Sequence, residues 1–393
     1  MAAKTKQSKG FLTRARSLFY TEQGFDTPFL IILLALLTIG MACMFSASYV
    51  NAYYHEGDSY FYIKKQLIFA AIGLAALLFC STIDYHKWHK AAIPVMGLAF
   101  VLLLLVLIIP SSGVQRWLPL PFFGAFQPSE VAKFALIVLF AHMVSLNFKS
   151  MHTLRNGYAP FMLVLIAVCG LTMLEPHLSG TILIFALGFV MMYIGGTKPR
   201  YLLLTILVGA AAVIFMIVVV GYEQDRISVW LDLEGTYNNR ETRDMAWQTM
   251  QSLYAIGSGG VMGQGFGNSY QKHLYLPEPQ NDFIFAIVCE EMGFIGALII
   301  IVLFGILVWR GFVIAMHAPD KFGFMLAIGL TSQIAIQVAI NIAVVTNLLP
   351  NTGISLPFFS YGGSSLVMLL AQMGILLSIS RWRSTKKELR KGE

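Results

Sequence analysis

The run FLIILLALLTIGMACMFSAS, residues 29–48, contains no charged side chain and matches the ~20 residues that an α-helix needs to cross the ~30 Å hydrocarbon core of a bilayer. Apolar residues make up 57% of the 393-residue chain and charged residues 12%, about half of the ~25% that is usual in soluble proteins. A soluble protein of this size has no interior large enough for so much apolar surface. The run therefore predicts a membrane-spanning helix.

Further apolar runs predict an all-α polytopic membrane protein with ten transmembrane helices and one long extracytoplasmic loop. A basic cytoplasmic leader is expected at residues 1–27, a membrane domain at 28–380, with the long loop at 221–281, and a basic cytoplasmic tail at 381–393. The ten spans are expected near residues 29–48, 66–80, 91–109, 131–146, 161–174, 181–194, 201–220, 283–309, 323–345 and 364–379.

Lysine and arginine are distributed unevenly between the two sides of these spans. An even number of spans puts both termini on one side, and the leader, the tail and the segments around Lys87, Lys149 and Lys198 then hold most of the positive charge. Because positively charged loops stay in the cytoplasm, both termini are predicted to be cytoplasmic. The net charge of +7 follows from this bias and suits anionic lipid rather than nucleic acid.

One stretch combines many glycines, two prolines and four carboxylates: QSLYAIGSGGVMGQGFGNSYQKHLYLPEPQNDFIFAIVCEEMG, residues 251–293. Asp282 stands where a polar loop ends and an apolar helix begins. Burial at such a boundary raises the pKa of a carboxylate and makes it a useful base. The simpler alternative is that Asp282 only caps the helix. Glu290 lies about 12 Å deeper along that helix, too far to share a proton with Asp282, and is expected to be a structural or cavity-lining carboxylate.

The glycine-rich run GSGGVMGQGFG within this stretch resembles a nucleotide-binding loop only superficially. It has neither the G-x-G-x-x-G spacing nor a Walker lysine followed by serine or threonine, so no nucleotide is expected. Glycines at this density either let the backbone approach another surface closely or present N–H groups to an anion. Both alternatives stay open from the sequence.

Other polar residues also fall on the predicted outer side. Glu130 and Lys133, three residues apart, share one face of the fourth span, either as a structural ion pair or as the lining of a polar cavity. Arg116 is an interfacial anchor or a cavity residue, and Glu175 a solvated loop residue or part of the same cavity. The loop at 346–365 offers hydrogen-bonding groups, among them Ser360, Tyr361 and Ser364.

Seven segments follow one another along the chain: RWLPL, QPSEVAKF, EPHLSGT, QSLYAIGSGGVMGQGFGNSYQK, LPEPQNDFIFA, CEEMGFIGA and NLLPNTGISLPFFSYGGSS. In this order they resemble the SEDS family, the FtsW, RodA and SpoVE group, over nearly the whole chain, and they lie nearer to its division and sporulation branch. The chain departs from the family pattern at His177 and Ser179, where EPDLG is usual, and at Asn281, which replaces a common threonine.

The resemblance implies a peptidoglycan glycosyltransferase in the bacterial cytoplasmic membrane, acting in division or sporulation. Such an enzyme polymerises lipid II, an undecaprenyl-diphosphate-linked disaccharide, on the outer face. It works with a class B penicillin-binding protein, a transpeptidase, and with other divisome or sporulation proteins. Asp282 matches the essential aspartate of the family, and Glu130 and Lys133 match its intramembrane pair.

The chemistry of glycosyl transfer is consistent with these residues. A base must activate the acceptor hydroxyl, and cations must stabilise the departing diphosphate. Asp282 is the expected base, or the ligand of a divalent cation such as Mg or Mn. The diphosphate would be bound by Arg116, Lys133, Lys272 or that metal, and the sugar or phosphate by Ser360, Tyr361 and Ser364. The alternatives are a lipid II flippase, which needs polar groups open to both sides, and a non-catalytic scaffold of a division complex.

Overall fold

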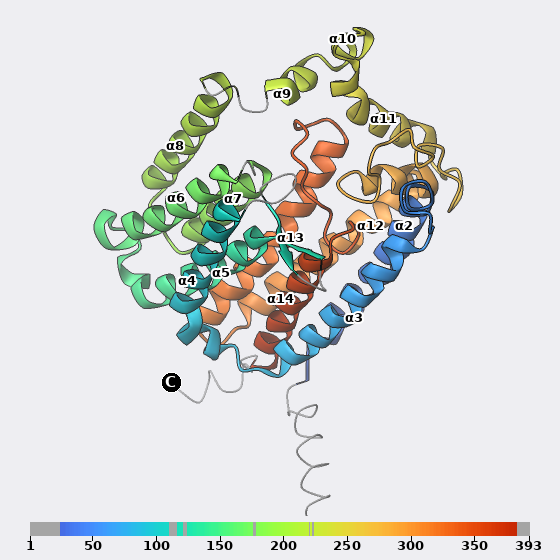
Figure 1. Cartoon of the computed structure of the whole chain (residues 1–393). Coiled ribbons are helices and arrows are strands. Elements are labelled where there is room, and N and C mark those ends of the chain that lie inside the picture. The colour runs from blue at the N-terminus through green and yellow to red at the C-terminus, as the bar shows by residue number, and fades with distance from the viewer. Residues whose placement is uncertain are drawn as a thin grey trace, which may run out of the picture.

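The structure, a computed structural model, describes residues 24–109, 116–120, 124–175, 178–219, 221 and 224–382. Most of residues 1–27 and 381–393, the predicted leader and tail, lie outside the described residues, as does His177. The apolar helices are α2 (Thr27–Glu56), α3 (Phe61–Thr82), α4 (His86–Ile108), α5 (Pro128–Asn147), α6 (Ala159–Leu174), α7 (Leu178–Ile194), α8 (Pro199–Val218), α12 (Ile284–Met316), α13 (Lys321–Val345) and α14 (Gly363–Arg381) (Figure 1).

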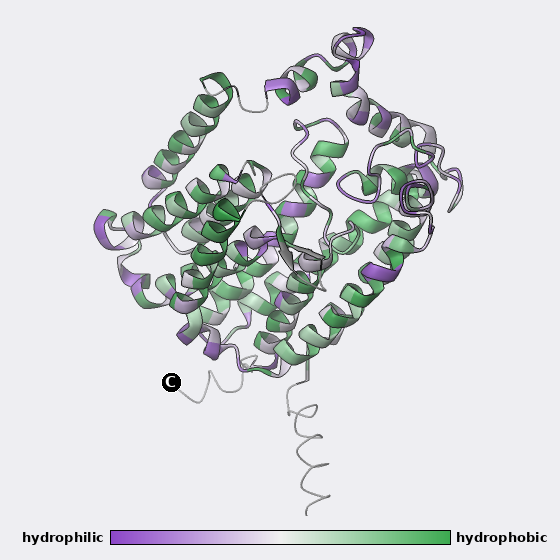
Figure 2. Ribbon diagram, viewed as in Figure 1, coloured by the Kyte–Doolittle hydropathy of each residue, from purple (hydrophilic) through white to green (hydrophobic). Residues whose placement is uncertain are grey.

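Each of the ten predicted spans coincides with one of these helices, within a few residues at most ends. In the part of the chain that is described, nine helices are long and apolar enough to cross a membrane, and α7 is apolar but has only 17 residues. Figure 2 shows the hydrophobic colour along these helices, with hydrophilic residues gathered at their ends and in the segment between α8 and α12. The chain is therefore an all-α multi-pass membrane protein with about nine or ten apolar helices.

The ends of α2 show how short sequence signals set the helix boundaries. Asp26 accepts a hydrogen bond from the backbone N of Phe29 at 3.1 Å, and a proline occupies the first turn. Gly57 ends the helix in the left-handed region, with φ of 73°, where a residue without Cβ is favoured. The sequence between these signals is mainly apolar and has no proline after the first turn, so one long helix can form.

The centre of the bundle is formed by α5 and α13, which are buried on most sides. α13 packs against α5, α7 and α12, and α14 packs along α3. In contrast, α8 packs against α7 and buries only Leu202 and Thr205 (Figure 1). The apolar surface of α8 therefore faces outward along most of its length, as expected of a helix in contact with lipid.

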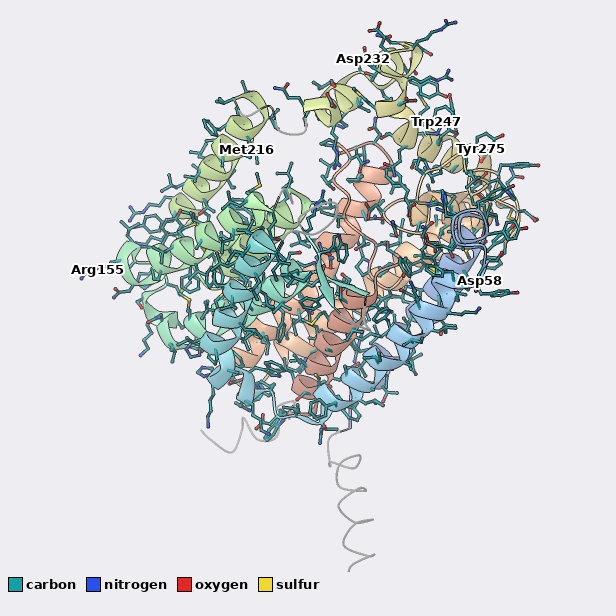
Figure 3. The ribbon with its side chains drawn as sticks, in the orientation of Figure 1. Asp58, Arg155, Met216, Asp232, Trp247 and Tyr275 are labelled. Atoms are coloured by element: carbon teal, nitrogen blue, oxygen red, sulfur yellow. The ribbon has the colours of Figure 1, made fainter. Side chains whose placement is uncertain are left out.

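The long predicted loop contains three helices, α9 (Gln224–Leu231), α10 (Leu233–Asn238) and α11 (Arg243–Gly259), which bridge from α8 to α12 (Figure 1). Two tryptophans fix them to neighbouring loops. Trp230 Nε1 donates to the carbonyl oxygen of Asn347 at 3.2 Å, and Trp247 Nε1 donates to that of Tyr275 at 2.7 Å. Trp247 and Tyr275 lie near each other at the upper right of Figure 3.

One short segment adds a pair of three-residue strands to the otherwise helical chain. Strands β1 (Leu118–Leu120) and β2 (Gly124–Phe126) pair antiparallel, and Leu118 lies opposite Phe126. The sequence here is rich in proline and aromatic residues and lacks the alternation of polar and apolar residues that indicates a strand. The remaining short elements are a 3-10 turn at Phe148–Ser150 and a π-helical turn at Leu154–Tyr158.

Helix α12 is broken at Gly293, where φ is 65° and ψ is −170°. The glycine-rich loop lies against this break. A Cβ on Gly263 would stand 2.2 Å from the carbonyl oxygen of Glu291, and one on Gly293 would stand 2.3 Å from the backbone N of Gly263. No side chain fits at either position. Close backbone approach is thus what these glycines provide, as one of the two alternatives predicted.

Candidate active site

Asp282 lies two residues before α12 and is held by the loop that precedes α14. Asn341 Nδ2, on α13, donates to the carbonyl oxygens of both Asp282 and Ile354, each at 2.7 Å. The carboxylate lies directly over Gly353, where an added Cβ would be 3.1 Å from Oδ2. Two segments about seventy residues apart in sequence are in this way fixed next to each other around one carboxylate.

The alternative that Asp282 only caps the helix is not supported. Phe283 is the N-cap residue of α12, and no side chain makes a capping hydrogen bond there. Burial raises the pKa of Asp282 to about 6, while the charges of Arg226 and Arg116 act in the opposite direction. A carboxylate with a pKa near 6 is ionised at neutral pH and is a stronger base than an ordinary aspartate.

The same two arginines line a cavity of about 90 Å³ that is open to solvent. Arg226 is fixed by its Nη1, which donates to the carbonyl oxygen of Asn351 at 3.0 Å. The Nε of Arg116 is buried and has no hydrogen-bond partner among the described residues. The other residues lining the cavity are Leu178, Ser179, Ile182, Val213, Ile217, Ile227, Pro350, Asn351 and Thr352.

This combination suits a lipid-linked diphosphate. Guanidinium groups bind phosphate oxygens in a bidentate manner, and two of them offset the charge of a diphosphate. The apolar lining comes mainly from α7, α8 and α9, and α8 is largely exposed on its other sides. The cavity therefore has an apolar side at α8 and a charged side at the two arginines.

Sequence reasoning did not find Arg226. It stands in the stretch QDRISVWL, which forms α9, and nothing in its immediate sequence marks it as different from the other arginines of the long loop. Arg226 lines the cavity because α9 packs against the loop before α14 in the folded protein. The local sequence around Arg226 does not indicate this contact. The apolar residues of this stretch, Trp230 among them, were a sign that it packs against other parts of the protein, but they did not single out Arg226.

Glu130 and Lys133 form the predicted ion pair at the start of α5. Lys133 Nζ lies 2.7 Å from Glu130 Oε1, and both side chains are about 95% buried. Glu130 Oε2 and Ser129 Oγ are buried without a hydrogen-bond partner among the described residues. The pair is not among the residues that line the arginine cavity. Its predicted place in the substrate-binding set remains a prediction.

Lys272 lies in a different environment from the one predicted. Its Nζ is fully buried, 2.7 Å from Glu291 Oε1 and 2.6 Å from the carbonyl oxygen of Gly267. It also donates to Ser46 Oγ at 3.2 Å and lies 4.9 Å from the ring centre of Tyr49. An ammonium group with this many partners is not available to a diphosphate in this arrangement. The geometry instead favours a structural role in holding the glycine-rich loop to α2 and α12.

Glu290 has the structural role that was one of its two predicted roles. It accepts hydrogen bonds from the backbone N of Tyr270 at 3.0 Å, from the backbone N of Gln271 at 3.3 Å and from the hydroxyl of Ser269. Together with the pair formed by Glu291 and Lys272, it anchors the glycine-rich loop on the first part of α12. These contacts position Asp282 indirectly, because that part of the helix follows it.

The loop before α14, predicted only to lie on the same side of the membrane, lies beside Asp282. The backbone N of Tyr361 donates to the carbonyl oxygen of Gln280 at 2.8 Å. Ser360 Oγ accepts from the backbone N of Leu356 at 2.8 Å, so this hydroxyl stabilises its own loop. Ser364 is partly exposed at the start of α14. Contact of Ser360, Tyr361 and Ser364 with a substrate remains a prediction.

Glu175 is not a solvated loop residue, because its side chain is fully buried at the end of α6. Both carboxylate oxygens lack a hydrogen-bond partner among the described residues. Burial raises the pKa of Glu175 to about 8, so the carboxyl group is mostly protonated at neutral pH. It follows that Glu175 adds no negative charge beside Ser179, which lines the arginine cavity four residues later.

The divalent cation expected at Asp282 would find few charged ligands besides that carboxylate among the described residues. Over the described ranges, no three His, Cys, Asp or Glu side chains are grouped so that they could hold a metal ion. Asp282 instead has two guanidinium groups near it, and their positive charge opposes a dication. Mg²⁺ prefers several oxygen ligands, and a divalent cation at Asp282 remains a prediction.

Comparison with known proteins agrees with this architecture. Stage V sporulation protein E of Bacillus subtilis is 42% identical over 365 residues, which cover 91% of this chain and 97% of the relative. The probable peptidoglycan glycosyltransferase FtsW of Trichlorobacter lovleyi is 39% identical over 361 residues, 91% of this chain and 93% of that protein.

Two solved structures have the same fold. The crystal structure of the rod shape determining protein RodA of Thermus thermophilus superposes with a TM-score of 0.67 at 26% identity, covering 92% of this chain and 98% of RodA. A chain of a peptidoglycan synthase complex superposes with a TM-score of 0.72 at 24% identity, covering 92% of this chain and 99% of that one. The family model for FtsW, RodA and SpoVE, described as cell cycle protein, matches residues 27–385. The chain belongs to this family.

Proposed function

We propose that the protein is a peptidoglycan glycosyltransferase that polymerises lipid II into glycan strands, for division or sporulation. The observation that carries this proposal is the placement of Asp282, with its raised pKa, beside a cavity that contains Arg116 and Arg226. The name of the FtsW relative supports the same activity. The test is direct: the purified protein, given lipid II alone, should produce glycan strands.

In the proposed reaction, Asp282 accepts the proton of the acceptor sugar hydroxyl. The hydroxyl oxygen forms a bond to the anomeric carbon of the donor as the bond from that carbon to the diphosphate oxygen breaks. Arg116 and Arg226 stabilise the negative charge that the leaving diphosphate gains. A single displacement inverts the anomeric carbon and needs one base, and Asp282, which lies over Gly353 and feels the charge of both arginines, would be that base.

The activity is expected to depend on pH through Asp282. Its pKa of about 6 lies above the ordinary value, so the basic form is lost as the pH falls through 6. The rate of strand formation should therefore rise with pH across this value and then level off. Initial rates in a pH series with constant ionic strength measure this dependence. A rate that is flat between about pH 5 and 7, where this carboxyl would titrate, argues against Asp282 as the base.

Substitution of Arg226 tests whether the charged side of the cavity takes part in the reaction. Replacement by glutamine removes the charge, and loss of one stabilising donor typically costs about 10²–10³-fold in kcat. Arg226→Lys keeps the charge but loses the bidentate geometry, so an intermediate loss is expected. Strand formation from lipid II measures both variants. Arg243→Gln is the matched control, because Arg243 is an exposed arginine of the same loop, stacked on Tyr237.

A loss in Arg226→Gln is informative only if the protein still folds, because Arg226 also bonds to the loop at Asn351. Thermal unfolding in detergent, followed by tryptophan fluorescence, distinguishes the two effects. Equal activity of Arg226→Gln and Arg243→Gln would remove the arginine cavity from the proposed mechanism.

We also propose that all ten helices cross the bilayer, with both termini in the cytoplasm and the site on the outer face of the cytoplasmic membrane. Support comes from the charge distribution, and α7 would cross as a short helix. A membrane-impermeant thiol reagent applied to intact cells should label Asn239→Cys, in the segment between α10 and α11, but not Lys198→Cys, before α8. Both positions are exposed and should react after permeabilisation. The opposite labelling pattern would invert the topology.

A class B penicillin-binding protein is the proposed partner. One solved relative belongs to a peptidoglycan synthase complex that coordinates polymerization and crosslinking, and strands made by this protein would need a transpeptidase to crosslink them. Other divisome or sporulation proteins are proposed on the basis of family membership. A flippase or a scaffold would not require Asp282 to accept a proton, which separates these alternatives experimentally.

A further inference from the structure

The glycine-rich loop carries an apolar surface that no described residue covers. Val261 is 64% exposed, Met262 78% and Phe266 57%. Residues 245–271 contain no Asp, Glu, Lys or Arg, and Lys272, the next charged residue, is fully buried against Glu291. The surface is therefore apolar and uncharged, although it belongs to a segment predicted to lie outside the membrane.

This surface is continuous with the lipid-facing side of α12. The backbone N of Phe294 donates to the carbonyl oxygen of Gly260 at 2.9 Å, and that of Ile295 donates to the carbonyl oxygen of Val261 at 3.2 Å. From Phe294 onward, α12 exposes large apolar side chains along one side, as expected of a membrane span: Phe294, Ile295, Leu298, Ile299, Ile301, Val302 and Ile306.

The exposed part of α12 is too short to cross the hydrocarbon core alone. Its cytoplasmic limit is marked by Trp309, which is exposed, and by Arg310, which pairs with Asp26 at the start of α2. From Phe294 to Trp309 the helix rises about 23 Å at ~1.5 Å per residue, roughly 7 Å less than the ~30 Å of hydrocarbon. Any tilt of the helix increases the shortfall.

The length of helix α2 gives an independent estimate of the distance between the glycine-rich loop and the cytoplasmic limit of the bundle. Asp26 and Ser46 are separated by about 30 Å along the helix at ~1.5 Å per residue. Ser46 Oγ donates to Glu291 Oε1 at 2.7 Å, and the backbone N of Gly265 donates to the carbonyl oxygen of Glu291 at 3.0 Å. The glycine-rich loop therefore lies about one hydrocarbon thickness from the cytoplasmic limit, at the opposite boundary of the acyl chains.

We propose that the segment Gly260–Gly267 is seated at the acyl–headgroup boundary of the leaflet on the Asp282 side, with Val261, Met262 and Phe266 in contact with acyl chains. Irregular backbone is tolerated at this depth only where its polar groups are bonded. Here Gln264 N donates to the carbonyl oxygen of Glu290 at 2.9 Å, and the Gln264 side chain donates to that of Ser258. Lipid contact would hold the loop against the part of α12 that follows Asp282. This proposal does not depend on the catalytic one.

Spin labels test the depth of the loop. In a chain whose four native cysteines are replaced, Met262→Cys and Phe266→Cys are labelled and reconstituted into nanodiscs of palmitoyl-oleoyl phosphatidylethanolamine and phosphatidylglycerol. Leu298→Cys reports the lipid face of α12, and Asn239→Cys reports water. The ratio of collisions with oxygen to collisions with a water-soluble nickel complex should exceed that at Asn239 severalfold and lie below that at Leu298, which is about 6 Å deeper along α12. A ratio equal to that at Asn239 overturns the proposal.

A photo-crosslinker provides a second measurement that keeps all cysteines. Benzoylphenylalanine at Met262, irradiated in native membranes, should give adducts with the mass of a phospholipid, as at Leu298. If the adducts at Met262 are exclusively with another protein, the surface is a protein interface and the lipid proposal is wrong. The lipid proposal would also be contradicted if Met262 gave neither lipid nor protein adducts while Leu298 gave lipid adducts.

Discussion

Asp282→Asn is expected to reduce strand formation by about 10²–10⁴-fold, the usual effect of losing a general base. Asparagine has nearly the same shape and still accepts a hydrogen bond, but it cannot take up a proton. The fold should be unaffected. The hydrogen bond from Asn341 that holds Asp282 in place goes to the backbone carbonyl oxygen of Asp282 and not to its carboxylate. Rates of lipid II polymerisation by the purified variant measure the loss.

Asp244→Asn provides the matched control. Asp244 is an exposed carboxylate in the first turn of α11, on the same predicted side of the membrane. Its replacement makes the same chemical change without touching the site and should leave the rate unchanged. If Asp282→Asn keeps the wild-type rate, or if both variants lose activity to the same extent, Asp282 is not the base.

The ion pair of Glu130 and Lys133 should show strong coupling between its two members. Glu130→Ala or Lys133→Ala leaves one buried charge without its partner, at a cost of about 3–5 kcal/mol in the free energy of unfolding. The double variant removes both charges and should be more stable than either single variant. Unfolding in detergent for the wild type, both single variants and the double variant completes the cycle.

The activity of the double variant decides what the pair does. A folded double variant that forms no strands would place Glu130 and Lys133 in the active cavity, as the sequence suggested. A folded double variant with normal activity would limit them to holding α5 in place. If all three variants unfold like the wild type, the close contact of 2.7 Å contributes little and the predicted coupling is wrong.

The membrane helices could be predicted because lipid imposes a simple rule on sequence. A span must be apolar for about 20 residues, and α2, α8 and α13 satisfy this rule without reference to the rest of the chain. The hairpin of β1 and β2 escaped prediction because its pairing is made by the backbone, and its prolines suggest a loop. The break at Gly293 was equally hidden, since the cause is the loop at Gly263 that packs against it.

The site was predictable in part. Asp282 was recognisable from its position at a span boundary, and Glu130 and Lys133 from their spacing within a span. Arg226 and Lys272 show the limit of this reasoning: both are cations on the same predicted side, yet one lines the cavity and the other is buried against Glu291. Which cation faces a ligand depends on the partners that folding brings to it, and local sequence does not contain that information.

Lipid II polymerisation by the purified protein tests the central claim most directly, namely that this chain alone forms glycosidic bonds at Asp282. The wild type and Asp282→Asn are compared at equal amounts in the same detergent, and the products are separated by length. We predict a ladder of glycan strands from the wild type and almost none from Asp282→Asn. Equal ladders from both, or no strands from a folded wild type that moves lipid II across a vesicle membrane, would contradict the account.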